Sequence, residues 1–175
     1  MGKKEREEEV FVLGGKRQYY RVNYSGIFDY KQLLNAVRSF FNEKHYAMIQ
    51  EEHTESAKSS GRETKFDIAP FRDVDEYVRF KINLELLMWR SLDVVVEENG
   101  KKIRKQKGDL EVRFKASIVK NYKPSFQKNK FGGFLRQTYE RYIIRRRLLD
   151  YEEKLQAETE ELINRIKSVL GISKR

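Results

Sequence analysis

Hydrophobic and polar residues alternate most regularly between Glu76 and Met88. A period of two places alternate side chains on opposite faces of a strand, so this stretch predicts a strand with one buried and one solvated face. We expect it to be the central strand of an antiparallel sheet. The residues expected on its buried face are Val78, Phe80, Ile82, Leu84, Leu86 and Met88.

Four further stretches in the first half of the chain show strand patterns bounded by glycine, proline or small polar residues. Pro70 stops the last of them, because proline cannot donate to a central ladder, and residues 70–75 are expected to form a loop. The four expected strands are Val10 to Leu13, Lys16 to Tyr24, Tyr46 to Ser56 and Arg62 to Ala69.

The alternation continues beyond the central strand with an interruption at Arg90-Ser91, which favours a bulge within one long strand. Asn99-Gly100 then predicts a tight hairpin turn, because both residues tolerate positive φ. Gly108-Asp109 predicts another turn before a last strand from Leu110 to Ile118. The expected sheet is a meander of about five to seven strands.

Two stretches have helical spacing of apolar residues. Asp29 is a good N-cap for an amphipathic helix from about Tyr30 to Lys44. Neither Gly nor Pro occurs from Phe134 to Leu170, and apolar residues recur there at helical intervals. This pattern predicts a C-terminal helix of roughly 37 residues, about 55 Å long at the usual rise.

The expected fold class is therefore α+β: an antiparallel sheet packed against one N-terminal amphipathic helix and one long C-terminal helix. We expect residues 1–9 to be a mobile charged tail, residues 10–150 a single domain, and residues 151–175 a helical extension. This order of elements, over residues 16–170, resembles the helix-grip superfamily of START-like and polyketide-cyclase-like proteins. The resemblance implies a sheet curved around the last helix, often with a cavity for an apolar ligand, and it carries no functional residue over to this chain.

Composition narrows the class of protein. Charged residues make up 37% of the chain and aromatic residues 13%, which is too aromatic for a disordered chain and unusually charged for a folded one. The absence of cysteine excludes disulfides and thiolate metal sites and suits a reducing compartment. The charged N-terminus lacks the apolar run of a signal peptide, so a cytoplasmic location is expected. The richness in Lys, Arg and Glu is typical of heat-adapted proteins.

The net charge of +10 is unevenly distributed. Residues 101–147 contain sixteen Lys and Arg against three acidic residues, a local charge of +13, so the rest of the chain carries −3. A local excess of this size is typical of a surface that binds an anionic polymer. The candidate contacts are Lys101, Lys102, Arg104, Lys105 and Lys107 on the hairpin, and Arg136, Arg141, Arg145, Arg146 and Arg147 on the last helix.

No motif for catalysis, metal binding or cofactor binding is present. His45 and His53 lack the spacing of a His-Glu-x-x-His zinc motif, and neither glycine pair has the context of a phosphate-binding loop. We therefore expect no catalytic residue, no metal and no cofactor, and a protein that is not an enzyme.

Three functions remain open. The first is a non-enzymatic protein that contacts RNA or a ribonucleoprotein surface through phosphates, using the basic hairpin and the arginine-rich helix face. The second is a container for an apolar small molecule, and the third is a structural subunit of an assembly. The first is preferred because it accounts for the charge distribution.

The far end of the last helix predicts a partner. A helix of about 55 Å is longer than strands of roughly six to ten residues, which span about 20 to 33 Å. Apolar residues near its end should then lack cover within the chain, so we expect self-association or a protein partner through residues 148–170. The expected interface residues are Leu155, Leu162, Ile166 and Leu170.

Overall fold

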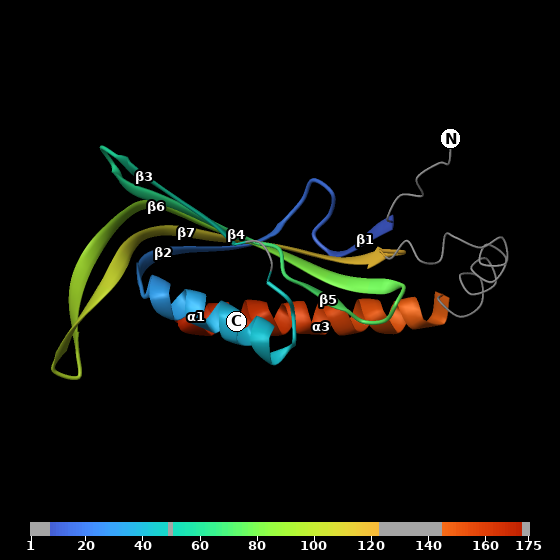
Figure 1. Cartoon of the computed structure of the whole chain (residues 1–175). Helices are drawn as coiled ribbons and strands as arrows, with labels where there is room; N and C mark the ends of the chain where they lie inside the picture. The colour runs from blue at the N-terminus through green and yellow to red at the C-terminus, as the bar shows by residue number, and fades with distance from the viewer. Residues whose placement is uncertain (1–7, 49–50, 123–144, 173–175) are drawn as a thin grey trace.

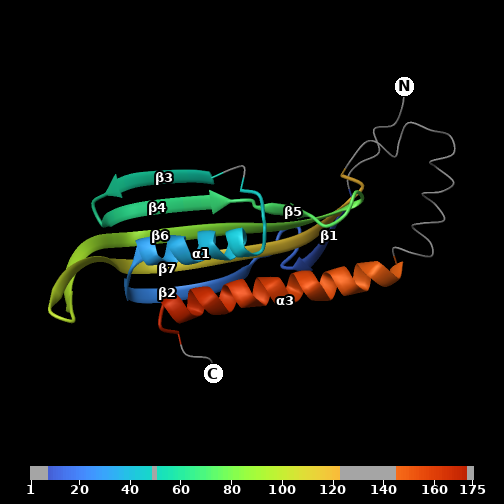
Figure 2. The ribbon, with the colours of Figure 1, turned by 60° about the horizontal axis from the view of Figure 1, so that its bottom comes forward.

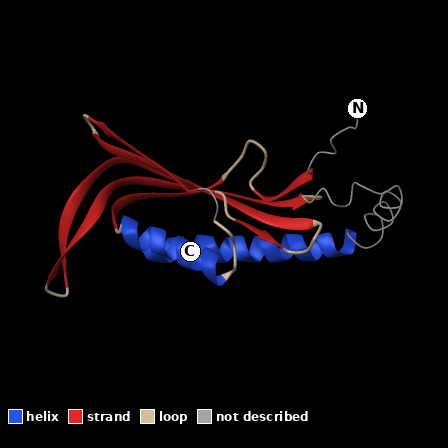
Figure 3. Cartoon of the chain, in the orientation of Figure 1, coloured by secondary structure: helices blue, strands red, loops and turns tan. Residues whose placement is uncertain are grey.

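A computed structural model describes residues 8–48, 51–122 and 145–172. These residues form a long, curved antiparallel sheet of seven strands, and both described helices cover the same face of it (Figures 1 and 3). We call the face with the helices the helix face and the opposite one the outer face. The predicted α+β class is confirmed.

The strand order is β1-β7-β6-β4-β3, with β2 also pairing with β7 and β5 with β6. The expected meander therefore holds only from β3 to β7, because β1 and β2 return to the other side of β7. The strands are β1 Glu8–Leu13, β2 Tyr20–Phe28, β3 Glu51–Lys58, β4 Gly61–Ile68, β5 Phe71–Asp73, β6 Val78–Glu98 and β7 Lys101–Lys120, and the helices are α1 Tyr30–Glu43 and α3 Arg145–Val169.

β6 and β7 form the centre of the sheet, as the alternating pattern predicts. All six residues expected on the buried face of the central strand are buried. They pair across the ladder with alternate residues of β7, for example Phe80 with Ile118 and Leu84 with Phe114. The apolar sets of the two strands thus share the helix face and make one continuous buried layer.

Several strand boundaries differ from the sequence prediction. Gly108-Asp109 is not a turn, because β7 runs without a break from Lys101 to Lys120. β2 continues through Ser25-Gly26 to Phe28 beside β7. β1 begins at Glu8, so residues 8 and 9 belong to the sheet rather than to the tail.

The region between α1 and the central strand also differs. Tyr46 is buried in the turn after α1 instead of beginning a strand, and the described part of β3 is Glu51–Lys58. The expected loop after Pro70 contains β5, which pairs with β6 and interrupts the simple pattern. Three residues are too few for a periodicity to show in the sequence.

α1 forms as predicted. The Asp29 side chain accepts a hydrogen bond from the Gln32 backbone N–H at 2.8 Å, which satisfies one of the unpaired donors of the first turn. One stripe of the helix is buried against the sheet, and His45 ends it in the left-handed region at φ 58°. The buried stripe consists of Leu33, Val37, Phe40 and Phe41.

α3 lies beside α1 on the helix face, and the two helices contact each other (Figure 2). The expected helical segment 134–144 lies outside the described residues. The 25 described residues of α3 span about 37 Å, whereas the 21 residues of β6 can span about 70 Å. β6 is thus longer than the described part of α3, and also longer than the roughly 55 Å expected for the whole helix.

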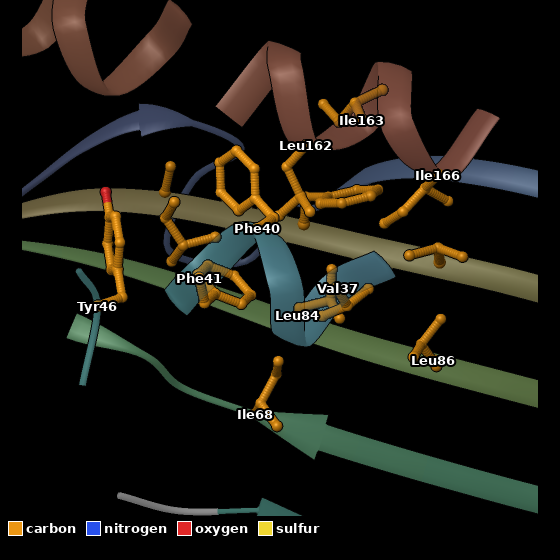
Figure 4. Close-up of a cluster of buried hydrophobic side chains, with 14 of the residues drawn as sticks. Val37, Phe40, Phe41, Tyr46, Ile68, Leu84, Leu86, Leu162, Ile163 and Ile166 are labelled. Atoms are coloured by element: carbon orange, nitrogen blue, oxygen red, sulfur yellow. The ribbon is translucent and has the colours of Figure 1, made fainter. Parts of the chain in front are cut away.

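The prediction that Leu155, Leu162, Ile166 and Leu170 lack cover is therefore wrong. All four are at most 5% exposed and belong to the same hydrophobic core as the sheet and α1. Figure 4 shows Leu162 beside Phe40 of α1. Residues 151–170 are consequently part of the fold and not a separate extension, and these four side chains offer no surface to a partner.

Candidate nucleic-acid interface

The β6–β7 hairpin projects beyond the rest of the sheet as a two-stranded ribbon. β4 pairs with β6 only as far as Ser91, and β2 pairs with β7 only as far as Gln106. Residues 94–98 and 101–105 pair with each other alone, and Figure 1 shows them curving away from the sheet. We call residues 92–107 the ribbon. Its β6 strand, residues 92–98, has seven residues and extends about 23 Å beyond the pairing with β4.

A β-bulge at the root of the ribbon produces the bend. The register between β6 and β7 shifts between Trp89 and Leu92, and Arg90 has φ 52°. Gly108 lies opposite, where an added Cβ would come within 2.8 Å of the Trp89 carbonyl oxygen. Glycine is required there because the backbone of the bulged strand approaches too closely for a side chain.

The tip of the ribbon is the predicted hairpin turn. Asn99 and Gly100 have φ 52° and 73°, and Glu98 pairs with Lys101 across them. Positive φ at both central residues is the requirement of a type I′ turn, whose twist matches that of the strands. The Asn-Gly signal in the sequence therefore placed this turn correctly.

Gln106 fastens the root of the ribbon to the first turn of α1. Its side-chain oxygen accepts from the Tyr30 backbone N–H at 3.1 Å, and its amide nitrogen donates to Asp93 at 3.3 Å.

Alternation along β7 places Arg104 and Lys102 on the helix face, and the other three basic residues of the ribbon on the outer face. The ribbon is thus anchored at one end and cationic on both faces.

Four of the five predicted hairpin cations have no ion pair among the described residues. Lys105 contacts Glu98 across the ribbon, whereas no acidic group of the described chain contacts the others. Each of the four is exposed. The unpaired cations are Lys101, Lys102, Arg104 and Lys107.

Several cations on the outer face of the main sheet, by contrast, form ion pairs with acidic residues of the chain. The carboxylate of Glu111 accepts from Arg113 and raises the pKa of that guanidinium. Hydrogen bonds from Ser25 and Arg90 lower the pKa of Asp109. The ion pairs of this face are Arg113 with Glu85 and Glu111, Arg90 with Asp109, Arg21 with Glu111 and Lys65 with Asp67.

The arginine run lies far from the ribbon. Arg145 begins α3 in the described chain, and the side chains of Arg146 and Arg147 are exposed there. Figures 1 and 2 place this end of α3 and the ribbon tip at opposite ends of the molecule. Arg136, Arg141 and the Arg145 side chain lie outside the described residues. The described cations therefore form two separate surfaces, and the expectation of one joint contact face needs correction.

A buried charge cluster was missed by the sequence reasoning. Arg72 of β5 donates to both carboxylate oxygens of Glu158 at 2.9 and 3.0 Å and to the Lys44 carbonyl oxygen at 2.7 Å. The Tyr46 hydroxyl also donates to Glu158, at 2.8 Å. Burial, followed by the charge of Glu158, raises the pKa of Tyr46.

This cluster joins β5, the end of α1 and the middle of α3. Each carboxylate oxygen of Glu158 accepts from Arg72, and one also accepts from Tyr46, so the buried charge is compensated in the way that buried ion pairs require. The only sequence signal was a glutamate at a position where the spacing of Leu155 and Leu162 puts the helix's buried stripe. We interpret the cluster as structural.

The histidines show no arrangement for chemistry. His53 stacks on Tyr30 with ring centroids 6.5 Å apart, and its Nε2 lies 3.7 Å from Glu55. Within the described residues, no group of three or more His, Asp and Glu side chains could hold a metal ion.

A hollow in the described chain lies at the outer face and has a volume of about 210 Å³. Glu52, Asp67 and Glu85 line it, so it is acidic and open rather than apolar and enclosed. It does not resemble the ligand cavity that the helix-grip resemblance implies.

Comparisons with protein-family models, curated proteins and solved structures find no match. Neither described helix is long and apolar enough to cross a membrane.

Proposed function

We propose that this protein binds nucleic acid, with RNA as the first expected ligand, through phosphate contacts made by the ribbon. The observation that supports this best is the set of four exposed, unpaired cations on an element that projects from the body. A two-stranded ribbon is also a shape that enters a nucleic-acid groove or lies along a strand. The separate arginine surface at the start of α3 would add contacts only for a ligand long enough to span the molecule.

The ribbon carries no aromatic side chain on which a base could stack. Lys and Arg that contact phosphates fix position without reading sequence. The binding we propose is therefore dependent on salt and largely independent of base sequence, as expected when counterion release dominates the affinity.

Binding by fluorescence anisotropy of labelled single-stranded RNA, duplex RNA and duplex DNA tests this function. Changing Lys101, Lys102, Arg104 and Lys107 together to Gln should reduce the slope of log affinity against log salt by about three to four, because each lost phosphate contact removes about 0.7 to 0.9. Thermal unfolding should change little, since these side chains are exposed.

A matched pair of double variants controls for net charge. Arg104→Gln with Lys107→Gln removes two ribbon charges, whereas Lys31→Gln with Lys154→Gln removes two exposed charges from the helices. Only the ribbon variant should weaken binding. Equal loss from both variants would show a non-local charge effect, and no binding by the unchanged protein at low salt would reject the proposal.

A further inference from the structure

Two strand edges that are unpaired in the described chain carry opposite charges. β3 pairs with β4 alone, all eight of its residues are exposed, and Glu51, Glu52 and Glu55 against Lys58 give it a charge of −2. The free edge of β7, residues 101–105, contains four basic residues and no acidic one, a charge of +4. Unpaired N–H and C=O groups along such edges are templates for another strand.

These charges select the partner of each edge. Two β3 edges would bring two negative strands together, and two β7 edges would bring two strongly positive strands together, so both pairings are opposed. Only β3 against β7 is attractive. Within one molecule, β4 and β6 separate the two edges, so the pairing requires two copies.

We propose that a second copy of this chain adds the free β7 edge of its ribbon to β3 as an antiparallel strand. Opposed residues of an antiparallel pair share a face of the sheet, and the best charge pairing that meets this condition sets Glu52 opposite Lys105 on the outer face and Glu55 opposite Lys102 on the helix face. In this register two of the three glutamates of β3 face a basic residue, and residues 52–56 match the whole free edge 101–105. The contact is head-to-tail, so each copy keeps one edge of each kind for a further copy.

This inference does not rest on nucleic-acid binding. The ladder uses backbone groups in the plane of the sheet, and Lys101 then faces Ser56 while Lys107 lies beyond the pairing. It also places self-association at the sheet edges rather than at α3, whose apolar residues are buried in the core.

Sedimentation velocity of nuclease-treated protein, with its absorbance ratio checked for residual nucleic acid, tests the pairing. The full chain should exceed its 21.0 kDa monomer mass as concentration rises at low salt and return to it at high salt. Glu52→Lys with Glu55→Lys should be monomeric, and so should Lys102→Glu with Lys105→Glu. Mixing the two variants should restore association, because each supplies the edge that the other now needs.

The absence of cysteine allows a direct test of the register. Thr54→Cys mixed with Ile103→Cys should give a covalent heterodimer with a short thiol cross-linker, since directly opposite Cβ atoms lie about 4.5 to 5.5 Å apart. Thr54→Cys mixed with Gln156→Cys, on the exposed side of α3, should not. A wild-type chain that stays monomeric, or a variant mixture that does, overturns the proposal. Neither result would bear on the nucleic-acid assay, which is done with labelled ligand at low protein concentration.

Discussion

At the scale of single residues, Arg72 and Glu158 show how a charge is kept inside this core. The guanidinium lies 4.7 Å from the centre of the Tyr46 ring and 5.3 Å from that of Phe80, so its flat faces meet aromatic surfaces while its edges donate. Desolvation of such a pair is costly, and only complete hydrogen bonding offsets it. The pair therefore specifies how α3 sits on the sheet more than it stabilises the fold.

This interpretation predicts an unequal response to substitution. Arg72→Met should lower the free energy of unfolding by about 3 to 5 kcal/mol, because it leaves the Glu158 carboxylate buried without its cation. The triple change Arg72→Met, Tyr46→Phe and Glu158→Leu should recover most of the loss, since no buried polar atom of the cluster then lacks a partner. Urea unfolding measures both, and a silent Arg72→Met would show that the cluster is already solvated.

At the scale of elements, the ribbon depends on a local feature shared by two strands. At the bulge of Arg90-Ser91, the backbones of β6 and β7 come unusually close. Gly108 permits this approach because it has no side chain, so the hydrogen-bonded ladder between the two strands continues past the bulge. The strands then continue past the sheet instead of turning, which carries the unpaired cations into solvent. The bend and the basic tip are thus one structural unit.

Gly108→Ala should lower the free energy of unfolding by about 1 to 3 kcal/mol, in the range of overpacked sites. The reason is that the atoms nearest the new Cβ are backbone atoms of Trp89 and Ser91, at 2.8 and 3.0 Å, which cannot move aside cheaply. Gly15→Ala is the control, because its Cβ would meet only the Gln18 side chain at 3.9 Å. Thermal or urea unfolding checks both, and equal stability of the two variants would contradict the role given to Gly108.

At the scale of the whole molecule, two helices and one long sheet share a single core. The core residues of α3 belong to the same cluster as those of α1, β6 and β7, so no part of this core is complete alone. The polar contacts between the helices, such as Arg165 with Glu43 at 2.6 Å, lie at the solvated margin. Such exposed ion pairs contribute little to the free energy of folding, so the buried apolar side chains hold the helices in place.

A chain ending at Tyr151 should therefore fail to fold. It loses Leu155, Leu162, Ile163, Ile166 and Leu170, each worth roughly 1.5 to 3 kcal/mol when buried, a total comparable with the whole stability of a typical domain. Circular dichroism and one-dimensional NMR would show the loss of tertiary structure. Gln156→Ala, on the exposed side of the same helix, should remain folded, and a folded truncated chain would show that the core does not need α3.

The sequence by itself determined the features that depend on neighbouring residues. Alternation located the buried faces of β6 and β7, Asp29 located the start of α1, and Asn99-Gly100 located the hairpin turn. Each of these is set by local backbone geometry and by side-chain period, which the chain displays directly.

Only the tertiary structure decided which strands pair and what covers each face. Gly108 looked like a turn because its real role, admitting the Trp89 backbone of another strand, is a contact between distant parts of the chain. The apolar residues of α3 looked uncovered because the expected strands were short, whereas β6 and β7 have 21 and 20 residues. The cations of residues 101–147 looked like one surface because proximity in sequence is not proximity in space, and a 20-residue strand carries its two ends far apart.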